Sequence, residues 1–356
     1  MFSRSYPLSS GSAVVYSCYP VYCSFLVLSE VFYCFFRTAN LHTNYRFDEP
    51  MRSQLRIRSP WSQLGIFFGL FGAGFFFSSV IAFIVLWMTG IPLSEFGNLD
   101  WSKPEILKAM KWLQALSSVT MFLLPALIFA FITVTRKPLH FLGLRKAQKP
   151  FAYWLAIVCI FVAFPFVFWL GELNQNIPLP VWMTDLEKDA LKQMQALLKV
   201  DHPADVFINV FIIALLPAIC EEICFRGALQ RIIIHITKNP WIGIIIASFL
   251  FSALHFQFQG FLPRMFLGMV LGALYWYSGS LWPSIIAHFV NNATQVIAVS
   301  FAPEYIEENP GMPVMAGIIS GVLVFLILRY FHKNSISSYY REYEVDDLNR
   351  QNQFLA

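Results

Sequence analysis

Long apolar runs alternate with short polar connectors along most of this chain. No charged residue occurs between Ser59 and Ser94. A helix needs about 20 apolar residues to cross the roughly 30 Å of hydrocarbon in a bilayer, so we expect a membrane-spanning helix over about residues 64–90. The same pattern predicts an all-α polytopic membrane protein, a bundle of about eight transmembrane helices. The further spans are expected at about 116–135, 151–171, 204–223, 241–256, 261–278, 281–301 and 312–331.

The composition agrees with this pattern. Hydrophobic residues make up 57% of the 356 residues and charged residues only 13%, whereas a soluble domain carries about 25% charged residues. So little charge cannot cover a water-facing surface on a chain of this length. The net charge of +4 is small and forms no dense basic stripe, so we expect membrane lipid as a partner and no nucleic acid.

Basic residues gather in alternate connectors and at the two ends of the set of spans. With eight spans, these connectors all face one side of the membrane, which the positive-inside rule assigns to the cytoplasm. We therefore expect an integral protein of a bacterial plasma membrane with both termini in the cytoplasm. The residues are Arg52, Arg56, Arg58, Arg136, Lys137, Arg145, Lys146, Lys149, Arg226, Arg231, Lys238, Arg329, Lys333 and Arg341.

The two ends of the chain differ from the apolar middle. Residues 1–50 form a non-core extension, in which Pro20 and Glu30 interrupt an apolar run. Met51 begins a basic segment typical of the start of a membrane protein, so our hypothesis is that residues 1–50 are not translated in the native protein. N-terminal sequencing of native protein tests this, and peptides from residues 1–50 would refute it. The tail, 334–356, is polar, and we expect it to be cytoplasmic and mobile.

Two acids stand at the end of one apolar run, and helical geometry separates them. An ionisable residue inside a span costs about 2.5–3.5 kcal/mol on insertion scales. Glu222 and Arg226 are spaced i, i+4 and can pair on one face. Glu221 is turned by about 100° from Glu222, which makes it the freer carboxylate and a candidate general base for water. The alternative is two acids that reach lipid headgroups at a helix end.

Two histidines and an amide lie in later spans. His255 ends the segment Phe251-Ser-Ala-Leu-His255, and a lone histidine on an apolar face is usually structural. His288 and Asn292 are spaced i, i+4, so they share a face and could stabilise an oxyanion together, although an interhelical polar contact is the alternative. Asn291 is assigned to a different face, and no catalytic part is expected for it. Taken together, these residues predict one polar pocket in an apolar bundle.

Three motifs occur in order, each in an apolar segment: Glu-Glu-x-x-x-Arg at 221–226, Phe-x-x-x-His at 251–255 and His-x-x-x-Asn at 288–292. The trio resembles the CPBP intramembrane proteases, also called the Abi or CAAX-protease family and typified by type II CAAX endopeptidases, over about residues 200–300. The resemblance implies a CPBP-like catalytic core at 201–302. A variable membrane half at 51–200 would precede it, and a last transmembrane helix at 303–333 would follow.

The resemblance also implies roles for individual residues. Glu221 resembles the catalytic glutamate that activates water, and His255 would help to hold or deprotonate that water. His288 and Asn292 resemble the oxyanion-stabilising pair, and Glu222 with Arg226 resembles a structural ion pair. No cofactor is certain. Zinc stays open, because Glu221, His255 and His288 also form a His₂Glu ligand set, although the helical HExxH signature is absent.

The predicted function is an intramembrane endopeptidase that cleaves a peptide or protein substrate near the cytoplasmic side of the bilayer. Prenylated CAAX substrates are the eukaryotic role of the family, and a bacterial membrane peptide or bacteriocin-type precursor is equally open. Three alternatives remain. They are a zinc-dependent form of the same protease, a catalytically idle scaffold or bacteriocin-immunity protein, and a proton-coupled transporter.

One expectation conflicts with this pocket. If the fourth span begins near Asp205 at the outer surface, Glu221 lies about 24 Å along it, close to the cytoplasmic face. If the fifth span begins inside near Asn239, His255 lies about 24 Å away from that face. The predicted boundaries therefore place the two residues at different depths. Either the fourth span starts deeper, or the helix after Glu222 runs on and carries the fifth span with it, and Pro217 or Pro240 could kink or break these helices. Because the three motifs together resemble the family, we expect the two residues to converge on one pocket.

Overall fold

The computed structural model describes residues 55–91, 99–101, 103–134, 137–302, 311–338 and 342–343, all of them in the second of two units, Asp48–Ala356. The predicted extension, residues 1–50, lies outside the described residues. The described part is helical and contains no β-strand, only an isolated antiparallel bridge between Leu55 and Val134. The predicted all-α fold is confirmed.

The helices follow the apolar runs, and two of the longer ones contain three π-helical segments in the described part, labelled η. The elements are α3 (Pro60–Met88), α4 (Pro104–Ser117), η2 (Ser118–Leu123), α5 (Leu124–Thr133), α6 (Pro138–Phe141), α7 (Phe151–Gln175), α8 (Val181–Leu198), α9 (Pro203–Asn209), η3 (Val210–Leu215), α10 (Leu216–Glu222), η4 (Ile223–Gln230), α11 (Arg231–Thr237), α12 (Pro240–Ala253), α13 (Phe261–Ser278), α14 (Leu281–Phe301) and α15 (Val314–Asn334).

Five helices in the described part are long and apolar enough to cross a membrane. This supports an integral membrane protein. Each of the eight predicted segments falls on a helix, but α12, α13 and α14 are not among the five, so the count of eight spans is not confirmed. Helix α12 has 14 residues, which is about 21 Å and less than the hydrocarbon thickness. The five are Pro60–Met88, Pro104–Thr133, Phe151–Gln175, Pro203–Thr237 and Val314–Asn334.

The helix that carries the two acids is longer than predicted. The predicted span ended at residue 223, but α9, η3, α10, η4 and α11 follow one another without a break from Pro203 to Thr237. Pro217 does not end this helix, because the π-helical turn η3 directly precedes the turn that contains it. A wider turn relieves the clash between a proline ring and the preceding carbonyls. Pro125 follows η2 in the same way.

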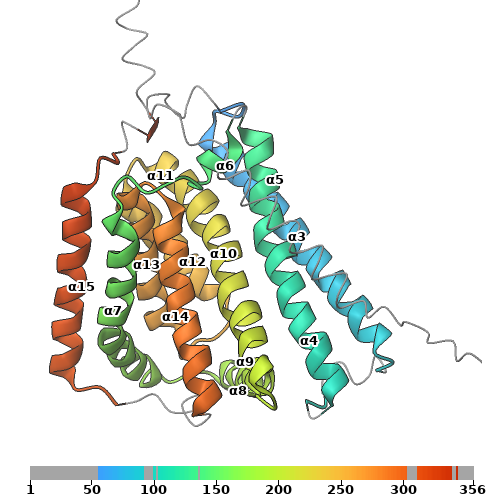
Figure 1. Ribbon diagram of the computed structural model, residues 1–356. Coiled ribbons are helices and arrows are strands. Elements are labelled where there is room, and N and C mark those ends of the chain that lie inside the picture. Colours follow the sequence, from blue (N-terminus) through green and yellow to red (C-terminus); the bar gives the residue numbers. More distant parts are fainter. Residues whose placement is uncertain are drawn as a thin grey trace, which may run out of the picture. The chain divides into compact units, whose positions relative to one another are not determined.

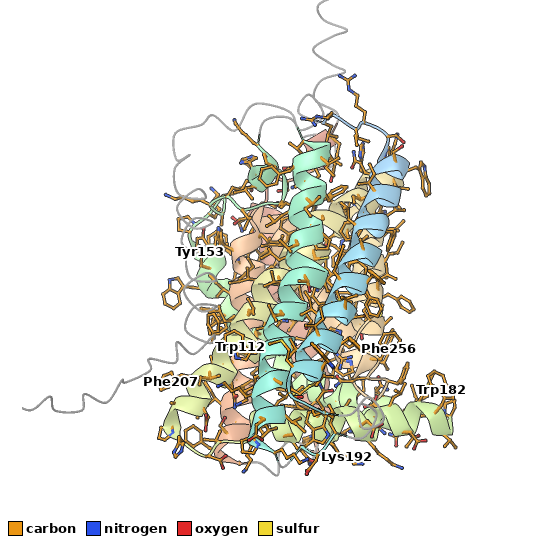
Figure 2. The ribbon with its side chains drawn as sticks, turned by 90° about the vertical axis from the view of Figure 1, so that its right-hand side faces the viewer. Trp112, Tyr153, Trp182, Lys192, Phe207 and Phe256 are labelled. Carbon is orange, nitrogen blue, oxygen red and sulfur yellow. The ribbon has the colours of Figure 1, made fainter. Side chains whose placement is uncertain are left out.

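The helices of the site lie in the middle of the unit. In Figure 1, α13 and α14 lie between α7 and the helix of α10, with α15 beyond α7 and with α3, α4 and α5 on the opposite side. Helix α12 packs on α13 and on α11. Figure 2 shows α8 crossing the lower end of the bundle, with Trp182 near its start and Lys192 further along. Helix α3 turns large apolar side chains such as Phe76 and Phe77 outward, as expected for lipid contact.

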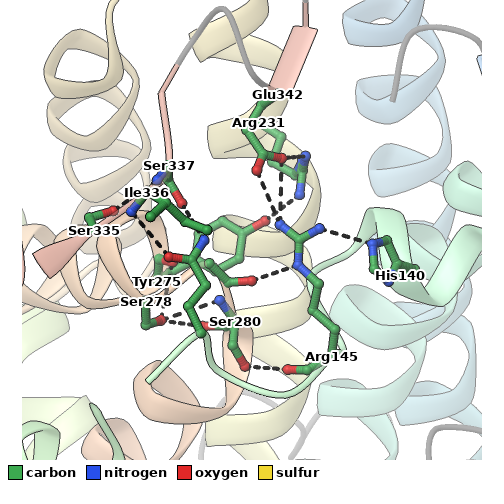
Figure 3. A network of polar contacts seen from close by, with 12 residues as sticks. His140, Arg145, Arg231, Tyr275, Ser278, Ser280, Ser335, Ile336, Ser337 and Glu342 are labelled. Carbon is green, nitrogen blue, oxygen red and sulfur yellow. Dashed lines mark hydrogen bonds and ion pairs between the residues drawn. The ribbon is translucent and has the colours of Figure 1, made fainter. Parts of the chain in front are cut away.

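Part of the polar tail is anchored, contrary to its predicted mobility. Figure 3 shows Glu342 accepting hydrogen bonds from Arg145 and Arg231, at 3.3 and 3.2 Å. The Tyr343 side chain is buried, and its hydroxyl donates to the Arg231 carbonyl at 3.0 Å. The physical reason for this contact is charge pairing, because without Glu342 the guanidinium groups of Arg145 and Arg231 would be buried without a carboxylate.

The connector before α7 is fastened to the same end of the bundle. Arg145 Nε donates to the Gly279 carbonyl at 2.6 Å, and Ser280 Oγ donates to the Arg145 carbonyl (Figure 3). Gln148 Nε2 donates to Ser337 Oγ at 3.1 Å. The turn between α13 and α14, this connector and the residues after α15 therefore form one polar network at one end of the helices.

Candidate active site

Glu222 is the centre of a buried polar cluster between the long helix and α14. Its side chain is fully buried. Arg226 Nη1 donates to Glu222 Oε1 at 2.5 Å, which confirms the predicted i, i+4 ion pair. His288 Nδ1 lies 2.9 Å from the same oxygen, and Ser284 Oγ donates to the other oxygen. Three partners occupy the carboxylate, so Glu222 is suited to hold other groups in place.

Arg226 extends this cluster to α12 and α13. Its side chain is 1% exposed, and Nη2 donates to the Gly268 carbonyl at 3.1 Å. The guanidinium also lies over the ring of Phe251, 4.6 Å from the centroid, a cation–π arrangement. A Cβ at Gly268 would lie 3.0 Å from Ser248 Cβ and 3.3 Å from Arg226 Nη2. An added side chain at this position would crowd both neighbours, so glycine eases the approach of Arg226 to the α13 backbone.

Glu221 is buried beside this cluster but is not tied into it. Its nearest basic partner is His288, whose Nε2 lies 3.9 Å from Glu221 Oε2. This distance is too long for a direct hydrogen bond and fits an intervening water. Because the contact with Glu222 assigns the Nδ1 proton of His288, Nε2 of the neutral ring carries the lone pair on the Glu221 side. Glu221 is the freer carboxylate, as predicted.

His255 lies beside the same cluster, as expected from the three motifs and in place of the different depths that the predicted span boundaries gave. Its ring is 4.9 Å from the Phe251 ring, which in turn is 5.9 Å from the His288 ring. Its Nδ1 lies 2.8 Å from the Phe251 carbonyl, an assignment that leaves Nε2 as the acceptor. The Phe-x-x-x-His spacing therefore places a phenylalanine between the two histidines.

The hairpin between α11 and α12 shows which of the two explanations holds: the helix after Glu222 runs on and carries α12 with it. Glu221 lies 16 residues before Thr237, and His255 lies 16 residues after Asn239. Both are therefore about 24 Å from the same turn. Lys238 makes this turn in the left-handed region with φ 57°. The predicted boundary had ended the fourth span at the acids and omitted the helix that continues beyond them.

Asn292 lies one turn beyond His288 on α14, and Asn291 bonds to it. Asn291 Nδ2 donates to Asn292 Oδ1 at 3.0 Å, and the Asn291 side chain is buried. Neighbouring helix positions differ by about 100°, so this contact joins two faces, and the absence of a catalytic part for Asn291 stays a prediction. Since His288 Nδ1 is engaged by Glu222, Asn292 is the member of the predicted oxyanion pair whose side-chain N–H has no partner among the described residues.

The conditional zinc set does not fit this arrangement. No group of three His, Cys, Asp or Glu side chains in the described ranges is placed to hold a metal ion. Glu221, His255 and His288 therefore do not form a three-residue ligand set in the described structure. The Nδ1 contact of His288 with Glu222 leaves its Nε2 available, so zinc dependence is a question for experiment.

Ser284, Phe251 and Gly268 belong to the site although sequence reasoning gave them no part. Ser284 precedes His288 by four residues, so the ladder Ser284, His288 and Asn292 on one helix face was a usable signal. Phe251 lay within a motif, but its contacts with both histidines depend on how α12 meets α14. No feature of the sequence around Gly268 indicated that it belongs to the site.

Comparisons with known proteins agree with the motifs. Residues 203–294 match the family model described as type II CAAX prenyl endopeptidase Rce1-like, which confirms the resemblance for this part of the chain. Together with the five apolar helices, the match supports a membrane protease. No solved structure matches the chain.

A curated relative covers a similar share of the chain. The chain is 31% identical over 97 residues to "Uncharacterized protein YpbD" of Bacillus subtilis (strain 168). The aligned stretch is 26% of this chain and 47% of that protein. The chain thus spans about half the length of the curated relative it matches.

Proposed function

We propose that this chain is an intramembrane endopeptidase in which Glu221 activates water. The observation that carries the proposal is a pair of adjacent buried carboxylates with different surroundings. Glu222 is bound by Arg226, His288 and Ser284. Glu221 faces only His288, at 3.9 Å, among the described partners. A carboxylate with unoccupied lone pairs beside an acceptor nitrogen can take a proton from a water held between them.

The proposed hydrolysis proceeds through a tetrahedral intermediate. Glu221 removes a proton from the water while the water oxygen forms a bond to the scissile carbonyl carbon. The carbonyl oxygen becomes an oxyanion, which accepts a hydrogen bond from the Asn292 side-chain amide. The tetrahedral intermediate then collapses, the C–N bond breaks, and the proton held by Glu221 passes to the leaving amine.

The remaining residues orient these groups. Glu222, itself fixed by Arg226, holds the His288 ring so that Nε2 points toward Glu221. His255 is proposed, from the family resemblance, to help hold the water, and its ring packs on Phe251, which packs on His288. Its Nε2 is left as an acceptor by the Nδ1 contact.

The substrate is proposed to be a peptide or protein associated with the membrane. The apolar helices around the site favour such a substrate over a soluble one. A prenylated CAAX sequence and a bacterial membrane peptide both satisfy this description. Glu221 lies about 24 Å from the α11–α12 turn, so the proposed cleavage lies within the depth of the bundle and not near the cytoplasmic side predicted from the basic connectors.

The test compares purified variants in detergent with a library of membrane peptides that includes prenylated and unmodified members. We expect the wild type to cleave and Glu221→Gln to lose at least 100-fold in kcat, because glutamine cannot take the proton. Glu105→Gln is the matched control, since Glu105 lies exposed in the first turn of α4. Cleavage by Glu221→Gln at the wild-type rate would refute the proposed base.

A chelator arm separates the glutamate mechanism from the zinc alternative. We expect cleavage to persist in chelator. Loss of cleavage with recovery on adding zinc would favour a metal mechanism instead. Absence of cleavage by every form across varied substrates would favour an idle scaffold, and proton movement in vesicles that depends on Glu221 would favour a transporter.

A further inference from the structure

Asn291 has a buried side chain with one satisfied end and one unsatisfied end. Its Nδ2 donates to Asn292 Oδ1 at 3.0 Å. Its own Oδ1 is buried and has no hydrogen-bond partner among the described residues. Buried amides that serve only packing normally have both ends satisfied. The one contact that holds this amide is therefore the contact with Asn292.

That contact decides which end of the Asn292 amide is free. A carboxamide has an acceptor oxygen and a donor nitrogen. When Oδ1 of Asn292 accepts from Asn291, the Nδ2 protons of Asn292 remain available to another acceptor. In the reverse orientation, Asn292 would donate to Asn291 and leave its own oxygen free, which would repel a developing oxyanion.

We infer that Asn291 is a positioning residue that fixes the Asn292 amide with its N–H groups toward the reacting carbonyl. The inference rests on the proposed function, since it gives Asn292 the oxyanion role. Asn291 itself touches no reacting atom in this assignment. It acts only through Asn292, so its effect on turnover must vanish when Asn292 is absent.

A double-mutant cycle tests this dependence. We expect Asn291→Ala to lower kcat about tenfold or more, with KM little changed, because a misoriented donor weakens transition-state stabilisation rather than substrate binding. In an Asn292→Ala background, the same change is expected to leave kcat unaltered. Equal losses in both backgrounds, or no loss in the wild-type background, would overturn the inference.

An isosteric variant separates hydrogen bonding from packing. Asn291→Leu keeps a similar side-chain size and shape but has no donor, so the Asn292 amide loses the contact that orients it. We expect Asn291→Leu to lose about as much kcat as Asn291→Ala. An active Asn291→Leu beside an inactive Asn291→Ala would show a packing role and contradict the inference. Thr294→Val is the control on the same helix, since among the described residues Thr294 Oγ1 bonds to the Val290 carbonyl of its own helix alone.

A spectroscopic arm does not depend on cleavage. With ¹³C-labelled asparagine, the Asn292 side-chain carbonyl signal can be identified by its loss in Asn292→Ala. We expect Asn291→Ala to move that signal, because the carbonyl loses a donor, and Thr294→Val to leave it in place. An unmoved signal would refute the inference. If the wild type cleaves nothing, the proposed function fails while this measurement still decides the orientation of the amide.

Discussion

Glu221 and Glu222 are adjacent in sequence, yet the groups around their carboxylates give them different chemistry. Glu222 faces Arg226, His288 and Ser284, and it is fully buried. Such a carboxylate is stabilised only while its partners remain. Glu221 lacks these partners and keeps its lone pairs free. The separation of roles thus comes from the 100° rotation between neighbouring residues and from what α14 places on each side.

Arg226→Ala is expected to destabilise the protein by about 3–5 kcal/mol, because it leaves the buried carboxylate of Glu222 without its cation. Denaturant unfolding in detergent, followed by circular dichroism, measures the change. Lys192→Ala is the control, since its ion pair with Asp189 is largely exposed and such substitutions change stability by about 0.5 kcal/mol or less. Equal losses of stability in the two variants would contradict the stabilising role assigned to the Glu222–Arg226 pair.

At the scale of elements, close helix contacts position the site. Helices α11 and α12 form a hairpin, and α12 crosses α13 close to Arg226. A Cβ at Gly243 would lie 2.3 Å from Ile234 Cγ1 and 3.1 Å from the Ile234 backbone nitrogen. The absence of a side chain at this position lets α12 approach α11, and the level of His255 depends on that approach.

Gly243→Ala is expected to cost about 1–3 kcal/mol through overpacking and to lower cleavage as His255 shifts. Gly69→Ala is the matched control on α3, where an added Cβ meets nothing within 4 Å. There the change should be neutral or stabilising by up to about 1 kcal/mol, because alanine favours a helix over glycine. Thermal unfolding and kcat are measured on both variants. A Gly243→Ala protein as stable and as active as the wild type would refute the explanation that α12 needs this close contact with α11.

At the scale of the whole described unit, the contact of Glu342 with Arg145 and Arg231 links the chain end to connectors far away in sequence. Burial alone would raise the pKa of Glu342, but Arg145 and Arg231 lower it below the usual value. Burial and the nearby Arg145 lower the pKa of His140 to about 3. His140 is therefore neutral near pH 7 and can accept the hydrogen bond from Arg145 at 2.9 Å.

These shifts predict an acid-sensitive chain end. His140 has a pKa of about 6.5 when unfolded, so its contribution to stability is present above pH 6.5 and declines as the pH falls toward 3. The contribution of Glu342 is present above its unfolded pKa of about 4.3 and is lost only at lower pH. We therefore expect the melting temperature to fall between pH 7 and pH 5, chiefly through His140.

His140→Asn is expected to flatten this pH dependence, and Glu342→Gln to lower the melting temperature at pH 7 without removing the slope between pH 7 and 5. Hydrogen exchange in α11 and at the end of α15 measures where the structure loosens. A slope that persists unchanged in His140→Asn would assign the acid sensitivity to other groups.

The sequence by itself determined the features that depend on neighbours along one helix. Apolar runs predicted the helices, and the i, i+4 spacing predicted the pairing of Glu222 with Arg226 and the shared face of His288 and Asn292. These predictions hold because helical geometry is fixed by the backbone. The order of the three motifs was likewise sufficient to identify the family that residues 203–294 match.

Only the tertiary structure decided how separate helices meet. The α11–α12 turn set the level of His255 along the bundle. Helix α14 brought Ser284 and His288 to Glu222. Polar partners allowed Arg226 and Arg231 to be buried inside a helix that was expected to end before them. The burial of Tyr343 could not be predicted either, because the residues around it in sequence are polar. Each of these depends on contacts between residues distant in sequence, which local periodicity does not encode.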